Sequence, residues 1–553
     1  MLLQNVAPQQ ATSLPNQIIE VMYSSELIGT AATPSTFGGV TRIVAAATVT
    51  LCLFGCASFG GIDSHATIQP AQAMETTLSL PDQGGAWPGL QWPTQFGGAP
   101  LQALIDEALA GNPSLQAAAS RVAAAQAAAE VTAGGAEPAI GAAFSATRQR
   151  YTENGIVPPP LAGKVETDSQ LAINFRYDFD FWGKNGAALR TALSQAKLSK
   201  AEQYNARLIL ATAVTRAWLQ LGRNTAQAGL VARQLQTREG LDRLTRLRVG
   251  AGLDTQSDNQ LSLQQAATLR AEVAQWQEAV ALSRNQLAAL LGRGPDRGLV
   301  IAAPALPPAA LTQLPNALQL TLIGRRPDLV AARWRVEAAQ GQIDYAKAQF
   351  YPNVDLMAFA GLSSLGLSNL LQAGSRVIGI GPAIRLPIFN SGTLRAQLSG
   401  QVAGYDGAVA SYNQSLTEAL HEVADGVRSL RAAEAQVDQL EQARQAAARA
   451  FTLAQQRRRV GTINQLQLLT VQAALLTQQR IALDARARRL DLHVGLIKAL
   501  GGGFDASADR LLIPPATPVT PPQATMIRPS SALSSPSPKF TAPAPSLFIR
   551  PAS

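Results

Sequence analysis

One stretch of the sequence occurs twice, and this repeat limits the folds that the chain can adopt. The first copy, residues 113–138, reads PSLQAAASRVAAAQAAAEVTAGGAEP, and the second, residues 327–352, reads PDLVAARWRVEAAQGQIDYAKAQFYP. Ten of the 26 positions are identical without a gap. A proline opens each copy, where a helix does not need its N–H, and a second proline precedes an alternating stretch. We therefore predict a helix followed by a strand, used twice, in a fold of two similar halves.

Alternation of apolar and polar residues predicts four β-strands, at about 138–149, 169–181, 353–362 and 377–388. The second is the clearest, because its apolar residues recur at every other position: Leu171, Ile173, Phe175, Tyr177, Phe179 and Phe181. This length exceeds that of most strands and suffices for a tilted strand through a membrane. Pro382 and Pro387 would fit poorly in a central strand, except at bulges or bends.

Four long helices are predicted at about 187–245, 255–291, 393–459 and 464–500. The first of them would extend about 90 Å. Its charged residues, such as Arg190, Glu202 and Arg216, exclude a helix that spans a bilayer. The helices should therefore project into water as coiled coils, while the strands lie in a membrane. The sequence predicts a mixed α/β membrane protein.

Four amphipathic strands cannot close a barrel alone. Every strand edge must be hydrogen-bonded in hydrocarbon, so we expect an oligomer in which several chains pool their strands.

The N-terminal residues are typical of an export signal. Arg42 is the first basic residue, and the apolar run IVAAATVTLCLFG at 43–55 follows it. Leu53-Phe54-Gly55-Cys56 resembles a bacterial lipobox, so we predict that residues 1–55 are a leader and lipoprotein signal peptide and that Cys56 is lipidated. A single transmembrane anchor is the alternative, for which the run is short.

The rest of the chain divides into four parts. Residues 56–98 are predicted to be a lipidated linker, because they are rich in Gly, Pro and Gln. Residues 99–315 and 316–501 are the two repeats. Residues 502–553, rich in Pro, Ser and Ala, are predicted to be disordered.

The composition argues against several classes of function. The net charge of +9 is spread thinly, so a nucleic-acid interface is not expected. The two cysteines lie near the N-terminus and the three histidines are scattered, and we expect no metal or other cofactor. The sequence contains no GxSxG, HExxH, P-loop or Rossmann motif, so we expect no enzyme. Asp178 and Asp180 are assigned to the polar face of a strand rather than to catalysis.

Several motifs together resemble the outer membrane efflux protein family of TolC-like channels. They are FDFWGK at 179–184, RRPDL at 325–329, AQFYP at 348–352, LPIF followed by Gly392 and Arg395, and two R-x-x-x-G turns. The lipobox makes the chain most similar to the NodT-type lipoproteins of tripartite efflux systems. The resemblance covers about residues 99–501. It implies a homotrimer with a 12-stranded barrel embedded in outer-membrane lipid, a helical tunnel in the periplasm, a periplasmic adaptor (membrane fusion) protein and an inner-membrane pump of the RND type.

The two R-x-x-x-G turns, at Arg248 with Gly252 and at Arg457 with Gly461, each lie between two long helices. We expect them to form the periplasmic mouth, with each glycine at the reversal. The resemblance makes these four residues the adaptor-facing tip. Ordinary loops between coiled-coil helices are the alternative.

The first of these turns is predicted to carry the charge of the mouth. Asp254 would occur as a ring of three carboxylates in a threefold assembly, and Asp258 could pair with an arginine. Both are candidates for the pore constriction. Ile463 occupies the position in the second turn that matches Asp254, so an acidic constriction is not expected there.

The expected function is a passive conduit from periplasm to exterior in the outer membrane of a Gram-negative bacterium. A trimeric coiled-coil envelope protein without transport is one alternative, and the outer-membrane conduit of a type I protein-secretion system is another. The strand pairs count against the first. The sequence leaves the cargo open among drugs, metals, aromatic compounds and polypeptides.

Overall fold

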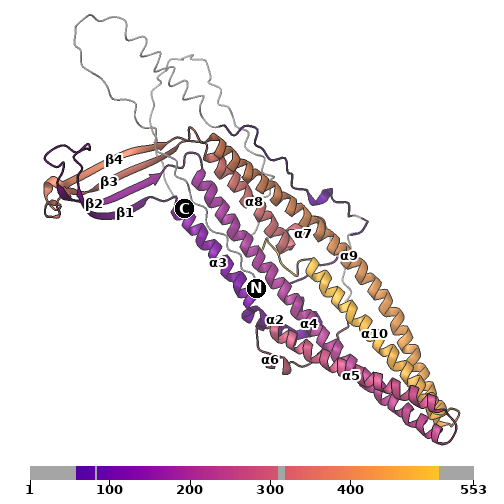
Figure 1. Cartoon of the computed structure of the whole chain (residues 1–553). Helices are drawn as coiled ribbons and strands as arrows, with labels where there is room; N and C mark the ends of the chain where they lie inside the picture. Colours follow the sequence, from indigo (N-terminus) through magenta and orange to yellow (C-terminus); the bar gives the residue numbers. More distant parts are fainter. Residues whose placement is uncertain (1–57, 77, 81–83, 309–314, 316–317, 510–553) are drawn as a thin grey trace, which may run out of the picture. The chain divides into compact units, whose positions relative to one another are not determined.

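A computed structural model describes residues 58–76, 78–80, 84–308, 315 and 318–509 (Figure 1). The predicted signal peptide, Cys56 and residues 510–553 lie outside this described part. The described chain is mostly helical with one four-stranded sheet, as predicted. Its helices are α2 (Thr94–Gly111), α3 (Pro113–Gly134), α4 (Lys184–Gly250), α5 (Gln256–Leu290), α6 (Asp296–Leu299), α7 (Leu318–Arg325), α8 (Pro327–Ala348), α9 (Ser391–Arg459) and α10 (Gln465–Ala499). Its strands are β1 (Ala139–Arg150), β2 (Val165–Asp178), β3 (Asn353–Leu365) and β4 (Arg376–Arg385), and three short 3-10 helices are η1 (Ala71–Ala73), η2 (Leu367–Asn369) and η3 (Ala373–Ser375).

The sequence repeat appears in the structure as two runs of the same elements. Helix α3 begins at Pro113 and leads into β1, and α8 begins at Pro327 and leads into β3. A second strand, a long helix, a turn and a further helix follow in each run. The two longest helices, α4 and α9, have 67 and 69 residues and so extend about 100 Å each.

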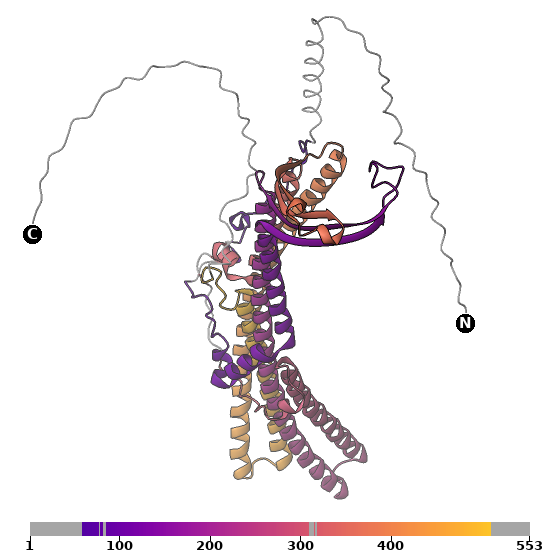
Figure 2. The same ribbon diagram turned by 90° about the vertical axis from the view of Figure 1, so that its left-hand side faces the viewer.

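The four strands form an antiparallel sheet in the order β1-β2-β3-β4. The central pairing, between β2 and β3, joins the two halves of the chain. The sheet is curved and lies at the end of the helical bundle where α4 and α9 begin (Figure 2). The other ends of those helices are therefore the ends farthest from the sheet.

Two strands end earlier than predicted. Strand β2 ends at Asp178 instead of about 181, because the Asp180 carboxylate accepts hydrogen bonds from the N–H groups of Asn185 (3.0 Å) and Gly186 (2.8 Å) and thereby caps α4. Strand β4 ends at Arg385 instead of about 388.

Proline accounts for the position of β4. Pro387 follows its end and cannot donate to a ladder. Pro382 lies inside it, opposite Leu356, on a strand at the edge of the sheet of this single chain.

Helix α4 is at the centre of the packing. It contacts α2, α3, α5, α8 and α10. Its Trp218 and Leu221 are buried with Phe96 of α2, Leu287 of α5 and Val494 of α10. Burying each such side chain stabilises the fold by about 1.5–3 kcal/mol, so this cluster fixes the helices of both halves around α4. Among the described residues, no helix combines the length and apolar character needed to cross a membrane.

Two segments predicted to be linker or tail pack against the helices. Trp92 and Phe96, predicted in the linker, are buried in the core around α4. The predicted disorder from residue 502 is wrong for residues 502–509, because Phe504 and Ala506 are buried against Trp334 and an ion pair joins Asp505 to Arg325 (3.0 Å). A single aromatic residue in a polar stretch was a weak signal for this packing.

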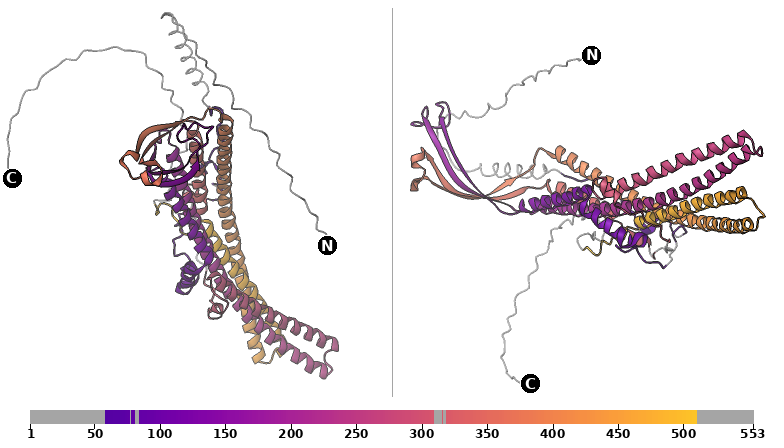
Figure 3. Two further views of the ribbon diagram at one scale, coloured as in Figure 1. Left: turned by 60° about the vertical axis from the view of Figure 1, so that its left-hand side comes forward. Right: turned by 90° about the horizontal axis from the view of Figure 1, so that it is seen from below.

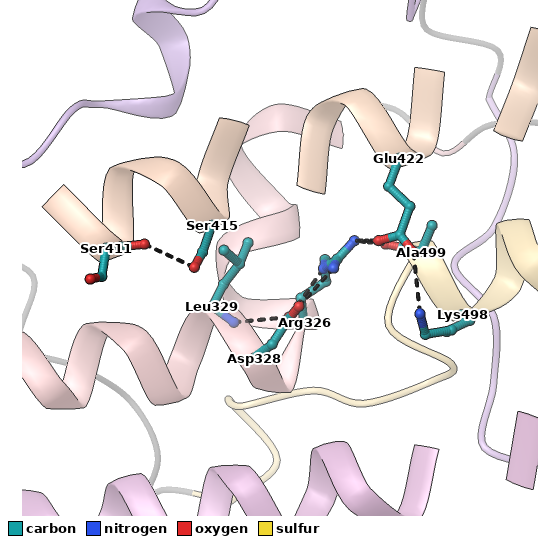
Figure 4. A network of polar contacts seen from close by, with 8 residues as sticks. All are labelled: Arg326, Asp328, Leu329, Ser411, Ser415, Glu422, Lys498 and Ala499. Carbon is teal, nitrogen blue, oxygen red and sulfur yellow. Dashed lines mark hydrogen bonds and ion pairs between the residues drawn. The ribbon is translucent and has the colours of Figure 1, made fainter. Parts of the chain in front are cut away.

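A buried arginine connects three helices of the second half (Figure 4). Arg326, just before α8, donates two hydrogen bonds to the carboxylate of Asp328 (2.7 and 3.1 Å), one to Glu422 of α9 (2.8 Å) and one to the carbonyl oxygen of Ala499 in α10 (3.1 Å). Burial disfavours its charge, but these bonds outweigh burial and hold the pKa of Arg326 above its ordinary value. Lys498 pairs with the same Glu422 (3.3 Å).

We expect Arg326→Ala to lower the free energy of unfolding by about 2–4 kcal/mol, because it removes the four hydrogen bonds of a buried guanidinium and leaves the carbonyl of Ala499 without this donor. Arg335→Ala, in α8 as well, is the matched control: its pair with Glu202 is exposed (52% and 42%) and contributes about 0–1 kcal/mol. Thermal melting of the helical circular dichroism signal in detergent measures both. Equal melting temperatures for the two variants would contradict the assignment.

Candidate functional site

Two helical hairpins, α4–α5 and α9–α10, extend away from the sheet and end in turns. They diverge toward these turns in two views of the chain (Figures 2 and 3). The turns contain the predicted tip residues of both R-x-x-x-G motifs.

The two turns have the same backbone. In the first, the N–H of Leu253 donates to the carbonyl of Arg248 (2.8 Å), and in the second the N–H of Thr462 donates to the carbonyl of Arg457 (2.9 Å). This pattern is the Schellman ending of a helix.

A glycine makes each reversal possible. Gly252 and Gly461 have φ angles of 72° and 78°, in the left-handed region that other residues rarely adopt. Thr255 and Asn464 then start the next helix with a capping box, which Asp258 completes in the first turn and Gln467 in the second.

The side chains of the two turns differ. In the first, the Arg248 guanidinium donates two hydrogen bonds to the carboxylate of Asp254, both 2.8 Å long. These bonds lower the pKa of Asp254 and raise the pKa of Arg248 relative to their ordinary values. Both groups are therefore charged at neutral pH, and each compensates the other.

Asp258 has a different role from the one predicted. We expected it to pair with an arginine, but its carboxylate accepts hydrogen bonds from the hydroxyl (2.6 Å) and N–H (2.9 Å) of Thr255. These bonds lower its pKa. Asp254, and not Asp258, holds the arginine of this turn, because a capping box uses the carboxylate three residues after the cap.

The second turn has uncompensated positive charge. Its sequence ends α9 with Arg457, Arg458 and Arg459, and residues 442–483 contain no Asp or Glu. In the described chain the side chain of Arg457 makes no ion pair, because the position of its carboxylate partner is taken by Ile463. Arg458 donates only to the neutral side chain of Gln465 (3.3 Å).

One face of the sheet is apolar across all four strands. The register places apolar residues opposite one another in continuous rows, one of which is Ile140, Phe175, Ala358 and Ile380, and the next Ala142, Ile173, Ala360 and Ile378. We call the face that these eight residues occupy the apolar face. The residues Ile140, Ile378 and Ile380 are 73%, 86% and 78% exposed, so this face is uncovered in the single chain.

The opposite face is more polar and includes Asn174, Arg176 and Asp355. The Asp355 carboxylate is buried and pairs with Arg176 (3.1 Å). Asp178 and Asp180, the carboxylate pair of the sequence, have separate structural roles: Asp178 pairs with Lys184 (3.0 Å), and Asp180 caps α4. In the described residues, no three side chains from among His, Cys, Asp and Glu gather in a way that could hold a metal ion.

The first described residues are fixed beside the sheet. The guanidinium of Arg395, near the start of α9, donates to the carbonyl oxygens of Ser58 and Gly60. Between them, the ring of Phe59 packs edge-on against the rings of Phe350 (5.5 Å between centroids) and Tyr351 (6.3 Å). Ser58 and Gly60 thus lie where helices meet strands, close in sequence to Cys56.

Comparison with known proteins identifies the family. The family model described as outer membrane efflux protein matches residues 104–293 and 319–502. The chain belongs to this family. As an outer membrane efflux protein, it is a channel protein of the Gram-negative outer membrane.

Individual relatives agree with this membership. The fusaric acid resistance protein FusA of Burkholderia cepacia is 35% identical over 376 residues, 67% of this chain and 71% of FusA. The multidrug resistance outer membrane protein MdtP of Escherichia coli strain K12 is 30% identical over 458 residues, 80% of this chain and 92% of MdtP. The crystal structure of the outer membrane protein VceC of Vibrio cholerae is similar, with a TM-score of 0.68 and 39% identity over 76% of this chain and all of VceC.

Sequence analysis of this efflux protein missed two contacts that the structure shows. The Arg248–Asp254 pair crosses a reversal of the chain, so no helical spacing indicates it. The contact of Arg395 with Ser58 and Gly60 joins residues more than 330 positions apart. In the sequence, Arg395 stood out as the last residue of a family motif, but the motif did not indicate which residues Arg395 contacts.

We expect Ile463→Asp to create in the second turn the ion pair of the first, because the two backbones match and Arg457 is positioned like Arg248. Amide hydrogen exchange at residues 457–464 should slow by about twofold to fivefold, in keeping with the small effect of exposed ion pairs. Ile463→Asn is the control, since it is polar but uncharged. Equal exchange in the two variants, or the same slowing when Arg457→Ala is combined with Ile463→Asp, would show that no pair forms.

Proposed function

We propose that three copies of this chain close a 12-stranded barrel and form a passive conduit from the periplasm to the exterior. The observation that carries this proposal is the exposed apolar face, whose edge strands β1 and β4 each lack a second neighbouring strand among the residues that the structure describes. In hydrocarbon each unpaired backbone group costs several kcal/mol, so β1 of one copy should pair with β4 of the next. Three sheets of four strands give a barrel wide enough for a pore.

The long helices then form the periplasmic tunnel. Helix α4 follows β2 and α9 follows β4, and these two strands run in the same direction, so both helices leave the sheet at the same end of its strands. Their charged surfaces require water. In this arrangement residues 99–315 and 316–501 are the two repeats of the channel, and the turns at Gly252 and Gly461 form its periplasmic mouth.

The mouth is the surface that we assign to the partners of a tripartite efflux system. A periplasmic adaptor protein would contact the tip residues Arg248, Gly252, Arg457 and Gly461, and an inner-membrane pump of the RND type would drive transport. Multidrug resistance in the name of MdtP and fusaric acid resistance in that of FusA support small toxic compounds as cargo.

Native mass spectrometry of the full-length protein in detergent tests the assembly, and we expect three copies. Planar-bilayer recordings of the same preparation should show ion-conducting channels. A monomer that conducts ions would refute the proposed barrel, because four strands cannot enclose a pore.

We also propose that Cys56 carries a lipid anchor after removal of residues 1–55. The contacts of Arg395 with Ser58 and Gly60 support this, since they bring the chain to the junction of helices and strands, where the inner leaflet would lie. The linker of residues 56–98 would then descend from the membrane along α9, where the N–H of Gln69 donates to the Asn413 side chain (2.9 Å).

Mass spectrometry of the mature N-terminus should find an acylated Cys56. Each buried CH₂ contributes about 0.8 kcal/mol to membrane binding, but the barrel also holds the protein. We therefore expect Cys56→Ser to reduce maturation more than membrane attachment of the assembled protein. An intact leader, or cleavage at another residue without acyl chains, would contradict the anchor.

Asp254 and Asp258 are our candidates for the pore constriction. Substitution of Asp254 gives the sharper test, because the charge of Asp254 compensates that of Arg248 within the turn. Asp254→Ala would leave three uncompensated arginines around the mouth of a trimer. We expect the ratio of cation to anion permeability to fall about threefold, given the size of one screened charge at about 7 Å in water.

Planar-bilayer recordings measure this ratio. Ile463→Ala is the matched control, because it removes the equivalent side chain of the second turn without changing charge. Unaltered conductance and selectivity in Asp254→Ala would place this turn away from the pore.

A further inference from the structure

At the outer end of the sheet, basic and acidic residues lie on opposite faces. Within the four strands, the apolar side of the sheet carries three charged residues, Arg148 and Arg150 of β1 and Arg376 of β4. The register fixes their orientation: Arg376 lies opposite Leu362, in the row that continues through Leu171 to Phe144. All three lie toward the outer end of the sheet, away from α4 and α9.

The opposite side of the sheet has the acidic residues. Glu166 and Asp168 lie opposite Gln149 and Thr147 at the same outer end, and Asp355 lies farther along that face. The outer end is therefore cationic on one side and anionic on the other. Charged residues that served only to keep the protein soluble would not need to be separated by sign onto the two faces.

The arginines lie about 20 Å along the membrane normal from the inner end of the apolar side, close to the height of the apolar band of an outer-membrane barrel. Eight residues separate Ile140 from Arg148 in β1, and eight separate Ile384 from Arg376 in β4. Eight residues of strand extend about 26 Å, or about 20 Å along the membrane normal for a strand tilted by about 40°. The apolar band of an outer-membrane barrel is about 25 Å tall. Both side chains would thus reach the level of the outer headgroups.

These side chains are free to bind a ligand. Arg148 and Arg376 are exposed and have no hydrogen-bond or ion-pair partner in the part of the chain that the structure describes. Arg150 pairs with Glu153 (2.8 Å), but both are more than half exposed and the pair is weak. Arg148 and Arg376 belong to the two edge strands, which the proposed trimer brings together at each of its three seams.

We propose that Arg148 and Arg376, with Arg150 beside them, bind the phosphate groups of lipid A in the outer leaflet. This inference rests on the proposed barrel, which turns the apolar face to lipid. Guanidinium groups bind phosphate through two parallel hydrogen bonds, and they do so most strongly where water is scarce. The lipid of the outer leaflet thereby bridges neighbouring copies across a seam.

Native mass spectrometry of the full-length protein in detergent tests this with three added lipids: bisphosphorylated lipid A, the same lipid with its phosphates removed, and phosphatidylcholine. The variant is the double substitution Arg148→Gln with Arg376→Gln. Arg385→Gln is the matched control, because Arg385 is an arginine of the same sheet on the other face. A basic residue near an anionic lipid surface contributes about 1 kcal/mol, so losing two should weaken lipid A binding about 30-fold.

The wild type and Arg385→Gln should bind the bisphosphorylated lipid equally and should prefer it to the other two. Equal binding by the double variant, or no preference for the phosphorylated lipid, would overturn the proposal. Displacement of the lipid from the wild type by inorganic phosphate alone would assign the arginines to free phosphate and would overturn it too. Bilayer recordings of each preparation distinguish failure of the lipid A site from failure of the proposed barrel. If the double variant loses lipid A binding but still forms channels, the barrel is supported independently of the lipid site. If the wild type forms no channels, both proposals are refuted.

Discussion

In each half of the chain, the residue before the repeated proline donates a hydrogen bond to the end of the half's second long helix, α5 or α10. Asn112 donates to the carbonyl of Leu290 (2.8 Å), and Arg326 donates to the carbonyl of Ala499 (3.1 Å). The proline keeps the backbone of the preceding residue extended, with φ and ψ of −73° and 122° at Asn112 and of −106° and 118° at Arg326. The carbonyls at a helix end have no partner within the helix, so this contact satisfies a group that would otherwise be buried without one.

The packing at this closure is too tight for a side chain. Gly292 and Gly501 follow the ends of α5 and α10 with φ angles of 69° and 88°. A Cβ atom at Gly292 would lie 2.4 Å from the carbonyl oxygen of Gly111, and one at Gly501 would lie 1.8 Å from that of Arg325. The two halves therefore share the same close backbone packing at this point. In the second half, the ion pairs of Arg326 stabilise it further. With both halves closed here, α4 and α9 can extend beyond the core as hairpins.

Much of this architecture follows from patterns that a sequence displays directly. Helix starts at Pro113 and Pro327, the two turns and the four strands depend on local chemistry, and the structure has each of them. What the sequence concealed depends on distance in space. Asp180 alternates like a strand residue, but its contacts with the next helix end the strand early. The end of the sheet at which Arg148 and Arg376 lie together became visible only when the register was known, because they come from strands more than 220 residues apart.

The matching backbones and unlike charges of the two turns have a consequence for symmetry. In the proposed trimer, six hairpins would surround the mouth, and by backbone alone they would repeat every sixty degrees. Their charges would repeat only every one hundred and twenty degrees, since turns with a compensated Arg248 alternate with turns that present an uncompensated Arg457. If six identical subunits docked on this mouth as a ring, every second subunit would contact a turn with a compensated Arg248 and the others a turn with an uncompensated Arg457. Adjacent subunits of that ring would therefore bind with different strengths.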